Sequence, residues 1–364
     1  MAFSIKVIDL DFDLSAEQKM LQESVSDLFV DAVDANSLVR LDTGELRALG
    51  AKLDGSLYEM GLAGILVPEQ DGGLNMGLLT LAVIAEQLGR NAAPTSLLRN
   101  ALAAWVISQA GSEAQKAQWL SPLLSGEVHA AFAIEAGDWL GDDGSVPAQG
   151  SPLRKRNVEG GELAGLFVVG LAGGQLGLAG ADAVRAEPRE NLLDVTRPIA
   201  DLSVMTDQVE PLAQSNALLD RLRDAHLILL AADAYGAGQR ALDLSTEYAM
   251  TRRQFDQVIG AFQGLKHQLA NMAAEIYPSR FLVWYAAHAW DEGFDDASYS
   301  SALAKAHVPD VAVRTARGSV EAHGGIGYTW EYPLHIFLKR AMYDREVWAG
   351  VETHRSRVAV AAGW

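Results

Sequence analysis

The sequence predicts a mainly α-helical protein with a small β domain in its centre. Apolar residues recur every three or four positions over residues 1–127 and again from about residue 213 onward, which is the spacing of amphipathic helices. Composition changes after Gly126, where short Gly-, Val-, Ala- and Leu-rich runs alternate with turn-forming residues, a pattern typical of strands. We therefore expect an N-terminal helical domain at 1–127, a middle β domain at 128–212 and a C-terminal helical domain at 213–364.

Length and composition limit the classes of function. A chain of 364 residues can form two or three domains with a large core. The absence of cysteine excludes disulfides, Cys-zinc sites and thiol catalysis. The net charge of −18 disfavours nonspecific binding to nucleic acid or to anionic membranes. No signal peptide or membrane span is evident, so we expect a cytoplasmic protein that binds neither nucleic acid nor membrane.

The N-terminal helices are marked by capping patterns. Ser15 and Gln18 form a capping box that opens the first helix, and Gly111 with Ser112 ends one helix and opens another. Pro68 closes a short apolar run that follows Gly61. The helices between these signals are expected at about 45–60, 77–89 and 97–110.

The middle domain is expected to contain strands at the apolar runs 128–135, 166–172 and 198–204. The stretch 145–157 is expected to be a surface loop. Helical periodicity returns after residue 213, but Pro278 and Pro309 lie inside it. An interior proline costs roughly 3 kcal/mol, so we expect local bends at both positions.

The stretch from Tyr248 to Met272 combines two arginines with the start of a helix. Arg252 and Arg253 end one helix, Gly260 interrupts the chain, and Gln263 lies in the first turn of the next helix. A guanidinium group and free N–H groups at a helix N-terminus together suit a phosphate or pyrophosphate. The alternative is a solvated arginine pair beside an ordinary turn.

Three blocks of sequence resemble the acyl-CoA dehydrogenase family. The first is Arg-x-Gln-Phe followed by Ile-Gly-x-Phe-Gln, within 248–272. The second is EAHGGIGYTWEYP at 321–333, and the third is VPEQDGG at 67–73 with AEQLGR at 85–90. The resemblance covers nearly the whole chain and is weak in the middle. It implies the family's α–β–α fold: an N-terminal helical domain, a β-barrel or sandwich, and a C-terminal four-helix bundle.

The resemblance also implies a cofactor and a reaction. Family members use FAD to desaturate an acyl-CoA between Cα and Cβ, and each FAD is shared between two subunits. The residues that match the family's contacts to the ADP half are Arg252, Phe255, Gln263, Glu321, Gly324 and Gly325. Two positions depart from the pattern, because Glu321 replaces the usual glutamine and Asp256 replaces a glycine. A carboxylate accepts hydrogen bonds and cannot donate them, so Glu321 loses any donor role.

The β domain lacks the family's contacts to the flavin ring. The family carries a Thr-Glu-Pro-x-x-Gly-Ser-Asp turn and a Trp-Ile-Thr-type strand. Here the first becomes AIEAGDWL at 133–140, of which Glu135 alone matches, and no equivalent of the second is found. The resemblance therefore implies a chain that is poorly equipped to hold a flavin ring.

The catalytic base is missing as well. Ala349 occupies the position of the family's usual glutamate, and His226 occupies the alternative position used by a subset of members. Abstraction of the weakly acidic α proton needs a positioned base, which alanine cannot supply. Glu352, Asp224 and His226 are candidate replacements, each better explained as a solvated or capping side chain. We assign no catalytic residue and no metal ligand.

Together these losses favour a non-catalytic subunit of a heteromeric acyl-CoA dehydrogenase. The ADP-side residues remain, whereas the ring-side motifs and the base are absent together. This combination resembles the base-lacking chains of α2β2 heterotetramers in bacterial steroid side-chain degradation. Two alternatives remain open: a self-sufficient homo-oligomer with a displaced base, and a flavin-free scaffold that binds acyl-CoA.

Overall fold

The computed structural model describes residues 13–33, 35–134, 152–213 and 215–364. The described helices of the N-terminal part are α1 (Ala16–Ala32), α2 (Ala35–Leu38), α3 (Thr43–Glu59), α4 (Gly77–Arg90), α5 (Leu97–Ala110) and α6 (Glu113–Ser125). The predicted capping boxes at Ser15 and Ser112 both form, and Asp42 opens α3 with a third. Local capping chemistry therefore predicted where two of these helices begin.

Two small sheets follow. One contains β1 (Ala130–Ala133), β3 (Leu166–Leu171), β4 (Gln175–Gly180) and β7 (Glu210–Pro211), in the order β1-β3-β4-β7, with β1 parallel to β3. The other contains β2 (Leu153–Glu159), β6 (Ile199–Val204) and β5 (Val184–Pro188), in the antiparallel order β2-β6-β5. Residues 153–157 therefore belong to a strand and not to the predicted surface loop; residues 145–151 lie outside the described part.

The first sheet is buried on both faces, which explains the continuous apolar run of β3. Alternate side chains point to opposite faces of a strand. Phe167 and Val169 pack against Leu202 and Val204 of the second sheet. Leu166 and Val168 instead join the large core that the N-terminal helices share with the C-terminal helices.

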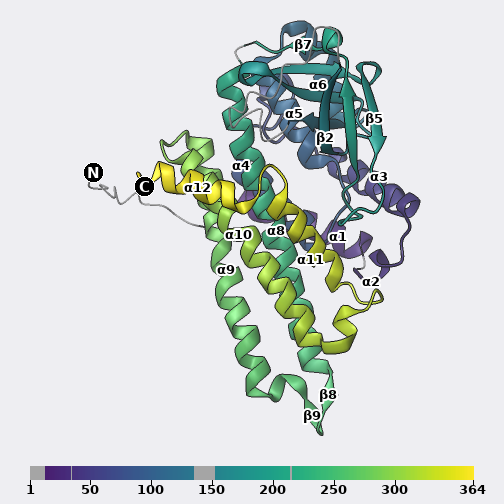
Figure 1. The fold of residues 1–364 in the computed structure, drawn as a ribbon, viewed down its shortest axis with the longest axis vertical. Helices are drawn as coiled ribbons and strands as arrows, with labels where there is room; N and C mark the ends of the chain where they lie inside the picture. The colour runs from purple at the N-terminus through teal and green to yellow at the C-terminus, as the bar shows by residue number, and fades with distance from the viewer. Residues whose placement is uncertain (1–12, 34, 135–151, 214) are drawn as a thin grey trace.

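The C-terminal part is built on long helices. They are α8 (Ser215–Thr251), α9 (Gln263–Glu292), α10 (Ala297–His323), α11 (Leu334–Glu346) and α12 (Val351–Ala361). A short hairpin, β8 (Arg253–Gln254) and β9 (Gln257–Val258), joins α8 to α9. Figure 1 shows the two β sheets beside one end of α8 and this hairpin at the opposite end of the molecule.

Both prolines are accommodated without ending a helix. Pro278 lies inside α9 and Pro309 lies inside α10. Pro309 is buried in the packed bundle. We attribute the continuity of α10 to the burial of its flanks, since packing supplies most helix stability in proteins. None of the described helices has the length and apolar character needed to cross a bilayer.

Candidate functional site

Ala349 lies in a tight connection between α11 and α12. Trp348 and Ala349 both adopt positive φ angles, 58° and 71°, a conformation that side-chain-bearing residues rarely take. Lys305 stabilises the connection, because its Nζ donates hydrogen bonds to the backbone carbonyls of Asp344 and Val347. The structure thus fixes the backbone at the position where the family resemblance expects a base.

A cavity of about 410 Å³ lies beside this connection, between the ends of β1 and β2 and the helices α8 and α11. The imidazole of His226 stacks on the indole of Trp348, with ring centroids 4.2 Å apart and planes inclined by 18°. Phe132 meets the edge of the same imidazole at 5.7 Å. An aromatic cluster therefore occupies the wall of the cavity next to Ala349.

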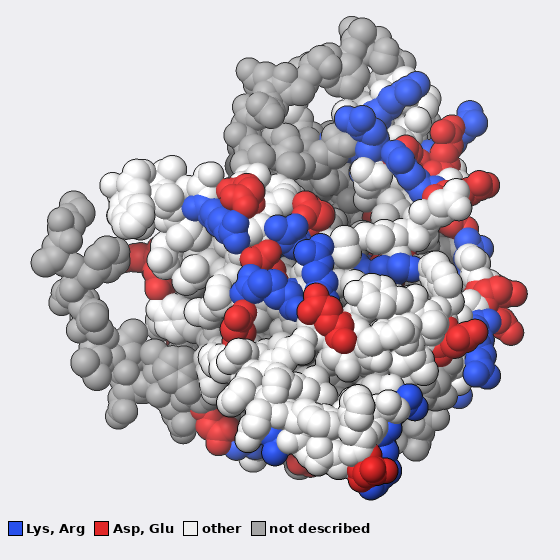
Figure 2. All heavy atoms as spheres, turned by 60° about the horizontal axis from the view of Figure 1, so that its bottom comes forward, with Lys and Arg blue, Asp and Glu red and all other residues white. Residues whose placement is uncertain are grey.

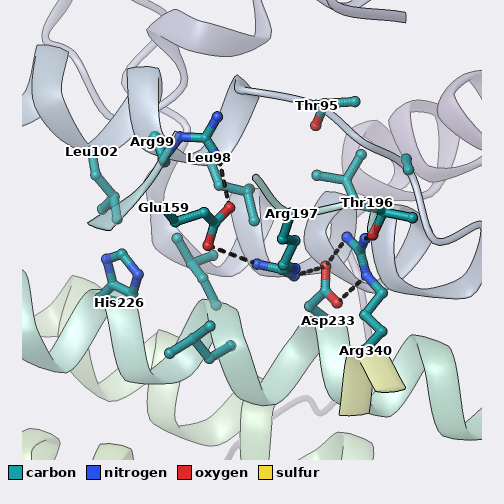
Figure 3. A pocket seen from close by; sticks show the side chains of 14 residues that line it. Thr95, Leu98, Arg99, Leu102, Glu159, Thr196, Arg197, His226, Asp233 and Arg340 are labelled. Carbon is teal, nitrogen blue, oxygen red and sulfur yellow. Dashed lines mark hydrogen bonds and ion pairs between the residues drawn. The ribbon is translucent and has the colours of Figure 1, made fainter. Parts of the chain in front are cut away.

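A chain of ion pairs, drawn in Figure 3, begins with Arg99 and Glu159 in the lining of this cavity and closes its inner end. Arg99 Nη1 lies 2.5 Å from Glu159 Oε1, and Arg197 Nη1 lies 3.2 Å from Glu159 Oε2. Arg197 Nη2 also lies 2.9 Å from Asp233, which Arg340 holds with two further bonds of 2.7 and 2.8 Å. We call these five residues the ion network.

The ion network joins parts of the chain that are far apart in sequence. Arg99 comes from α5, Glu159 from the end of β2, Asp233 from α8 and Arg340 from α11. The side chains of Asp233 and Arg340 are 1% and 3% exposed, so neither charge is stabilised by solvent. Removing one partner of such a pair leaves the other charge buried and unpaired.

The network sets the charge states around the cavity. Burial alone would raise the pKa of Glu159, but the guanidinium groups of Arg197 and Arg99 outweigh it and bring the pKa to about 2. Burial lowers the pKa of His226 to about 3 despite the nearby Glu159 carboxylate. Burial raises the pKa of Asp344 well above its usual range, and Arg197 does not offset this. At neutral pH, Glu159 is therefore an ion-paired carboxylate and His226 is a neutral imidazole.

Little space remains among the five residues of the ion network. The cavity that all five of them line has a volume of about 30 Å³. A water needs a cavity of roughly 10–15 Å³ by this kind of measure. The space therefore holds one or a few waters and cannot hold an acyl chain while the ion pairs are closed.

Two of the three candidate replacement bases, Glu352 and Asp224, lie away from the cavity beside Ala349. The side chain of Glu352 is 79% exposed and pairs with Arg355 at 2.6 Å. Asp224 is buried on a different face, where Arg223 lies at 2.9 Å and Arg357 at 3.4 Å. Of the three candidates His226 alone lines the cavity beside Ala349, and its Nδ1 has no hydrogen-bond partner among the described residues.

The predicted ADP-side residues gather at the opposite end of α8. Tyr248 near the end of α8 stacks on His323 at the end of α10, with ring centroids 4.4 Å apart. This contact brings the 321–325 segment close to the β8–β9 hairpin. His323 itself is buried and hydrogen-bonded to Ser319 and Tyr332, as expected for a packing residue. The six predicted contact residues are all exposed: Arg252, Phe255, Gln263, Glu321, Gly324 and Gly325.

The groups at this end suit a phosphate-bearing ligand. Gln263 is the first residue of α9, and no side chain caps the free N–H groups there. The guanidinium of Arg252 pairs with no carboxylate among the described residues. Phe255 is 86% exposed, and the hairpin turn at Phe255 and Asp256 has φ angles of 52° and 64°, so Asp256 adopts the positive φ usual for glycine. Figure 2, which turns this end forward, shows basic and acidic side chains interspersed.

The two candidate sites are too far apart for one dinucleotide to contact both. His226 and Thr251 are separated by 25 residues of continuous helix. At about 1.5 Å per residue this corresponds to roughly 38 Å. A ligand on the Arg252 surface of one chain therefore cannot reach the Ala349 cavity of the same chain.

The ion network was missed from the sequence. Asp233 is a single charge in the otherwise apolar stretch 227–235, and it is buried inside the chain against Arg340 and Arg197. A buried carboxylate requires a cation nearby, and this requirement was the available signal. No pattern in the neighbouring sequence indicated which arginines would pair with Asp233. Glu135 lies outside the described residues.

Two family descriptions match the chain. "Acyl-CoA dehydrogenase, N-terminal domain" matches residues 15–127, and "Acyl-CoA dehydrogenase, C-terminal domain" matches residues 225–362. Acyl-CoA dehydrogenase IpdE2 of Mycobacterium tuberculosis is 30% identical over 326 residues, which cover 89% of this chain and 91% of that protein.

Solved structures share the fold along nearly the whole chain. Butyryl-CoA dehydrogenase of Megasphaera elsdenii superposes with a TM-score of 0.84 at 23% identity, covering 98% of this chain and 100% of the other. The structure described as the Tcur3481-Tcur3483 steroid ACAD G363A variant superposes with a TM-score of 0.80 at 26% identity, covering 95% and 98%. The predicted order of a helical domain, a small β domain and a helical domain is confirmed.

Proposed function

This chain belongs to the acyl-CoA dehydrogenase family, and we propose that it is the non-catalytic subunit of a heteromeric, FAD-dependent member. In this proposal an acyl-CoA thioester is desaturated between Cα and Cβ on a partner chain of the same family. The partner supplies the flavin-ring contacts and the carboxylate base. This chain would supply contacts to the ADP half of the FAD, whose flavin ring, held by the partner, would provide the hydride acceptor.

The observation that carries the proposal is the cavity beside Ala349, which lacks a carboxylate at the base position and is closed at its inner end. A chain that performs the reaction needs a base and space for both a flavin ring and an acyl group. Here the base position holds a methyl group, and the inner end of the cavity is occupied by Arg99, Glu159 and Arg197. Moving these side chains apart would separate buried opposite charges, which is strongly unfavourable.

The exposed ADP-side surface supports the proposed role of this chain in binding the ADP half of the FAD. Arg252 and the N-terminus of α9 provide positive charge that no described carboxylate neutralises. Their exposure means that a cofactor bound there would remain half-open to solvent unless another chain covered it. A partner chain with an open flavin site would complete the pocket.

The proposed substrate and stoichiometry rest on similarity. The Tcur3481-Tcur3483 structure is described as a steroid ACAD, and its designation joins two proteins. By analogy we propose a bulky steroid side-chain CoA ester as the substrate and an α2β2 heterotetramer as the assembly. A heterotetramer with two complete sites would bind two FAD molecules.

The proposal is tested by expressing this chain alone and together with an acyl-CoA dehydrogenase-like chain from the same genome that retains the catalytic glutamate. The flavin absorbance spectrum and the molar ratio of FAD to protein are measured after gel filtration. We expect a colourless protein from the single expression and one FAD per pair of chains from the co-expression. One FAD per chain in this protein purified alone would overturn the proposal.

A further inference from the structure

A further cavity of about 510 Å³ borders the ion network at Arg99. It is bounded by α3, by the start of α5 and by the connection between β5 and β6. Ligand pockets for small molecules typically occupy about 300–1,000 Å³ and have mostly apolar walls. The apolar side chains that line this cavity include Leu46, Pro94, Leu163, Leu192, Val195 and Ile199.

A buried hydrogen-bond network forms one wall of this cavity. Ser96 Oγ donates to Asp54 Oδ2 at 2.7 Å, and the backbone N–H of Ser96 also donates to this carboxylate. Tyr58 Oη lies 2.7 Å and His129 Nδ1 lies 2.8 Å from the same Ser96 Oγ. Asp54 and Ser96 are 7% and 5% exposed, so this arrangement is part of the protein interior.

The network determines which proton His129 carries. A serine hydroxyl has one proton to donate and two lone pairs with which to accept. Burial raises the pKa of Asp54; when this carboxyl is ionised it takes the Ser96 proton, so Ser96 Oγ accepts from both Tyr58 and His129, which places a proton on His129 Nδ1. Burial lowers the pKa of His129 despite the nearby Asp54 carboxylate, so the ring is neutral at pH 7 and Nε2 is an unprotonated acceptor. Nε2 has no partner among the described residues.

The arginines that line the cavity are already paired with carboxylates. Arg47 pairs with Glu162, Arg99 pairs with Glu159 at 2.5 Å, and Arg189 pairs with Asp201 at 2.8 Å. An anionic ligand would therefore have to break an existing pair to gain a cation. A neutral ligand meets no such cost, which favours a neutral occupant over a CoA ester.

We propose that this cavity binds a neutral, mainly apolar small molecule and that His129 Nε2 accepts a hydrogen bond from a hydroxyl group of that ligand. The network has no proton left to donate, so a carbonyl group in the same place would gain nothing from it. The site is separate from the FAD and acyl-CoA contacts of the proposed function and does not depend on them.

The test compares an alcohol with the ketone that has the same carbon skeleton. Binding of 2-adamantanol and 2-adamantanone to the full-length protein is measured by saturation-transfer NMR titration. We expect the alcohol to bind about three- to tenfold more tightly, the range for one neutral hydrogen bond. His129→Phe keeps a ring in place and should abolish this preference while the ketone still binds.

A second variant keeps the test decisive if His129→Phe does not fold. Val195 lines the cavity but is 48% exposed, so Val195→Trp should fill the space without disturbing the core. Val195→Trp should lose binding of both probes at unchanged melting temperature. Equal affinities for the alcohol and the ketone, no binding of either by the wild type, or full binding by Val195→Trp would each overturn the proposal.

Discussion

The ring of His226 lies flat against the ring of Trp348, and this stack stands directly beside Ala349. His226 comes from the middle of α8, and Trp348 comes from the connection after α11. The two rings form part of the wall of the cavity in which the family resemblance places the catalytic base. The imidazole of His226 is neutral at pH 7, because burial lowers its pKa to about 3. The cavity next to Ala349 is thus shaped by packing, and its imidazole is a much weaker base than a free histidine.

Restoring a carboxylate should not restore activity. In Ala349→Glu the new side chain would still face a cavity whose inner end is closed by Arg99 and Glu159. We expect no reduction of an electron-accepting dye by the variant purified alone, with butyryl-CoA as substrate and added FAD. Turnover by this single variant would show that only the base was missing and would contradict a closed cavity.

The ion network should contribute strongly to stability. Asp233→Asn removes the carboxylate that neutralises Arg197 and Arg340, which leaves two buried cations poorly matched. We expect the free energy of unfolding to fall by roughly 3–5 kcal/mol. Glu275→Gln is a matched control, because Glu275 pairs with Arg314 on the surface and is 53% exposed. The control should cost about 0–1 kcal/mol.

Urea unfolding followed by circular dichroism measures both changes. The slope of the transition should stay constant, so that the midpoint reports stability alone. Similar midpoints for Asp233→Asn and Glu275→Gln would show that the buried pairs contribute no more than surface pairs.

Arg252 should matter for FAD in the assembled complex. Replacing Arg252 with alanine removes the unpaired guanidinium beside the start of α9. Hydrogen bonds to charged groups contribute about 1.5–3 kcal/mol, so we expect FAD to dissociate about ten- to a hundredfold more readily. The control is Arg185→Ala, an arginine that is 80% exposed on β5. FAD retention is measured by equilibrium dialysis of the co-expressed complex. Equal retention by both variants would show that the ADP half of the FAD does not bind at Arg252.

Lys305 should make stability depend on pH. Burial lowers the pKa of Lys305 to about 7 from 10.5, outweighing the carboxylates of Asp344 and Glu346. Between about pH 7 and 10.5 the unfolded chain therefore binds one proton more than the folded chain. Stability contributed by this group rises with pH across that window and is constant below it.

The measurement is a series of urea unfolding curves at pH 7, 8, 9 and 10 for the wild type and for Lys305→Met. Other groups also titrate in this range, and they cancel in the difference between the two proteins. The difference should change by several kcal/mol across the series. Two parallel pH profiles would show that Lys305 keeps its proton in the fold.

Local patterns in the sequence predicted the helices well, because the interactions that start and stabilise a helix join residues that are close in sequence. The capping residues Ser15 and Ser112 and the three- and four-residue apolar spacing act within one or two turns of chain. The stretch 153–157 was wrongly expected to be a loop, since β2 is polar along much of its length and gains its hydrogen bonds from β6. Strand pairing of this kind depends on a partner more than forty residues away.

The sequence by itself determined the fold family, the substitution of alanine at position 349 and the retention of Arg252 and Gln263. Each of these depends on which residue stands at a position. Only the tertiary structure decided that Asp233 points into the chain, that Arg340 and Arg197 neutralise it, and that Arg99 with Glu159 closes the cavity beside Ala349. A buried charge must find its partner in space, and residues from α5, β2, α8 and α11 meet only after the helices have packed.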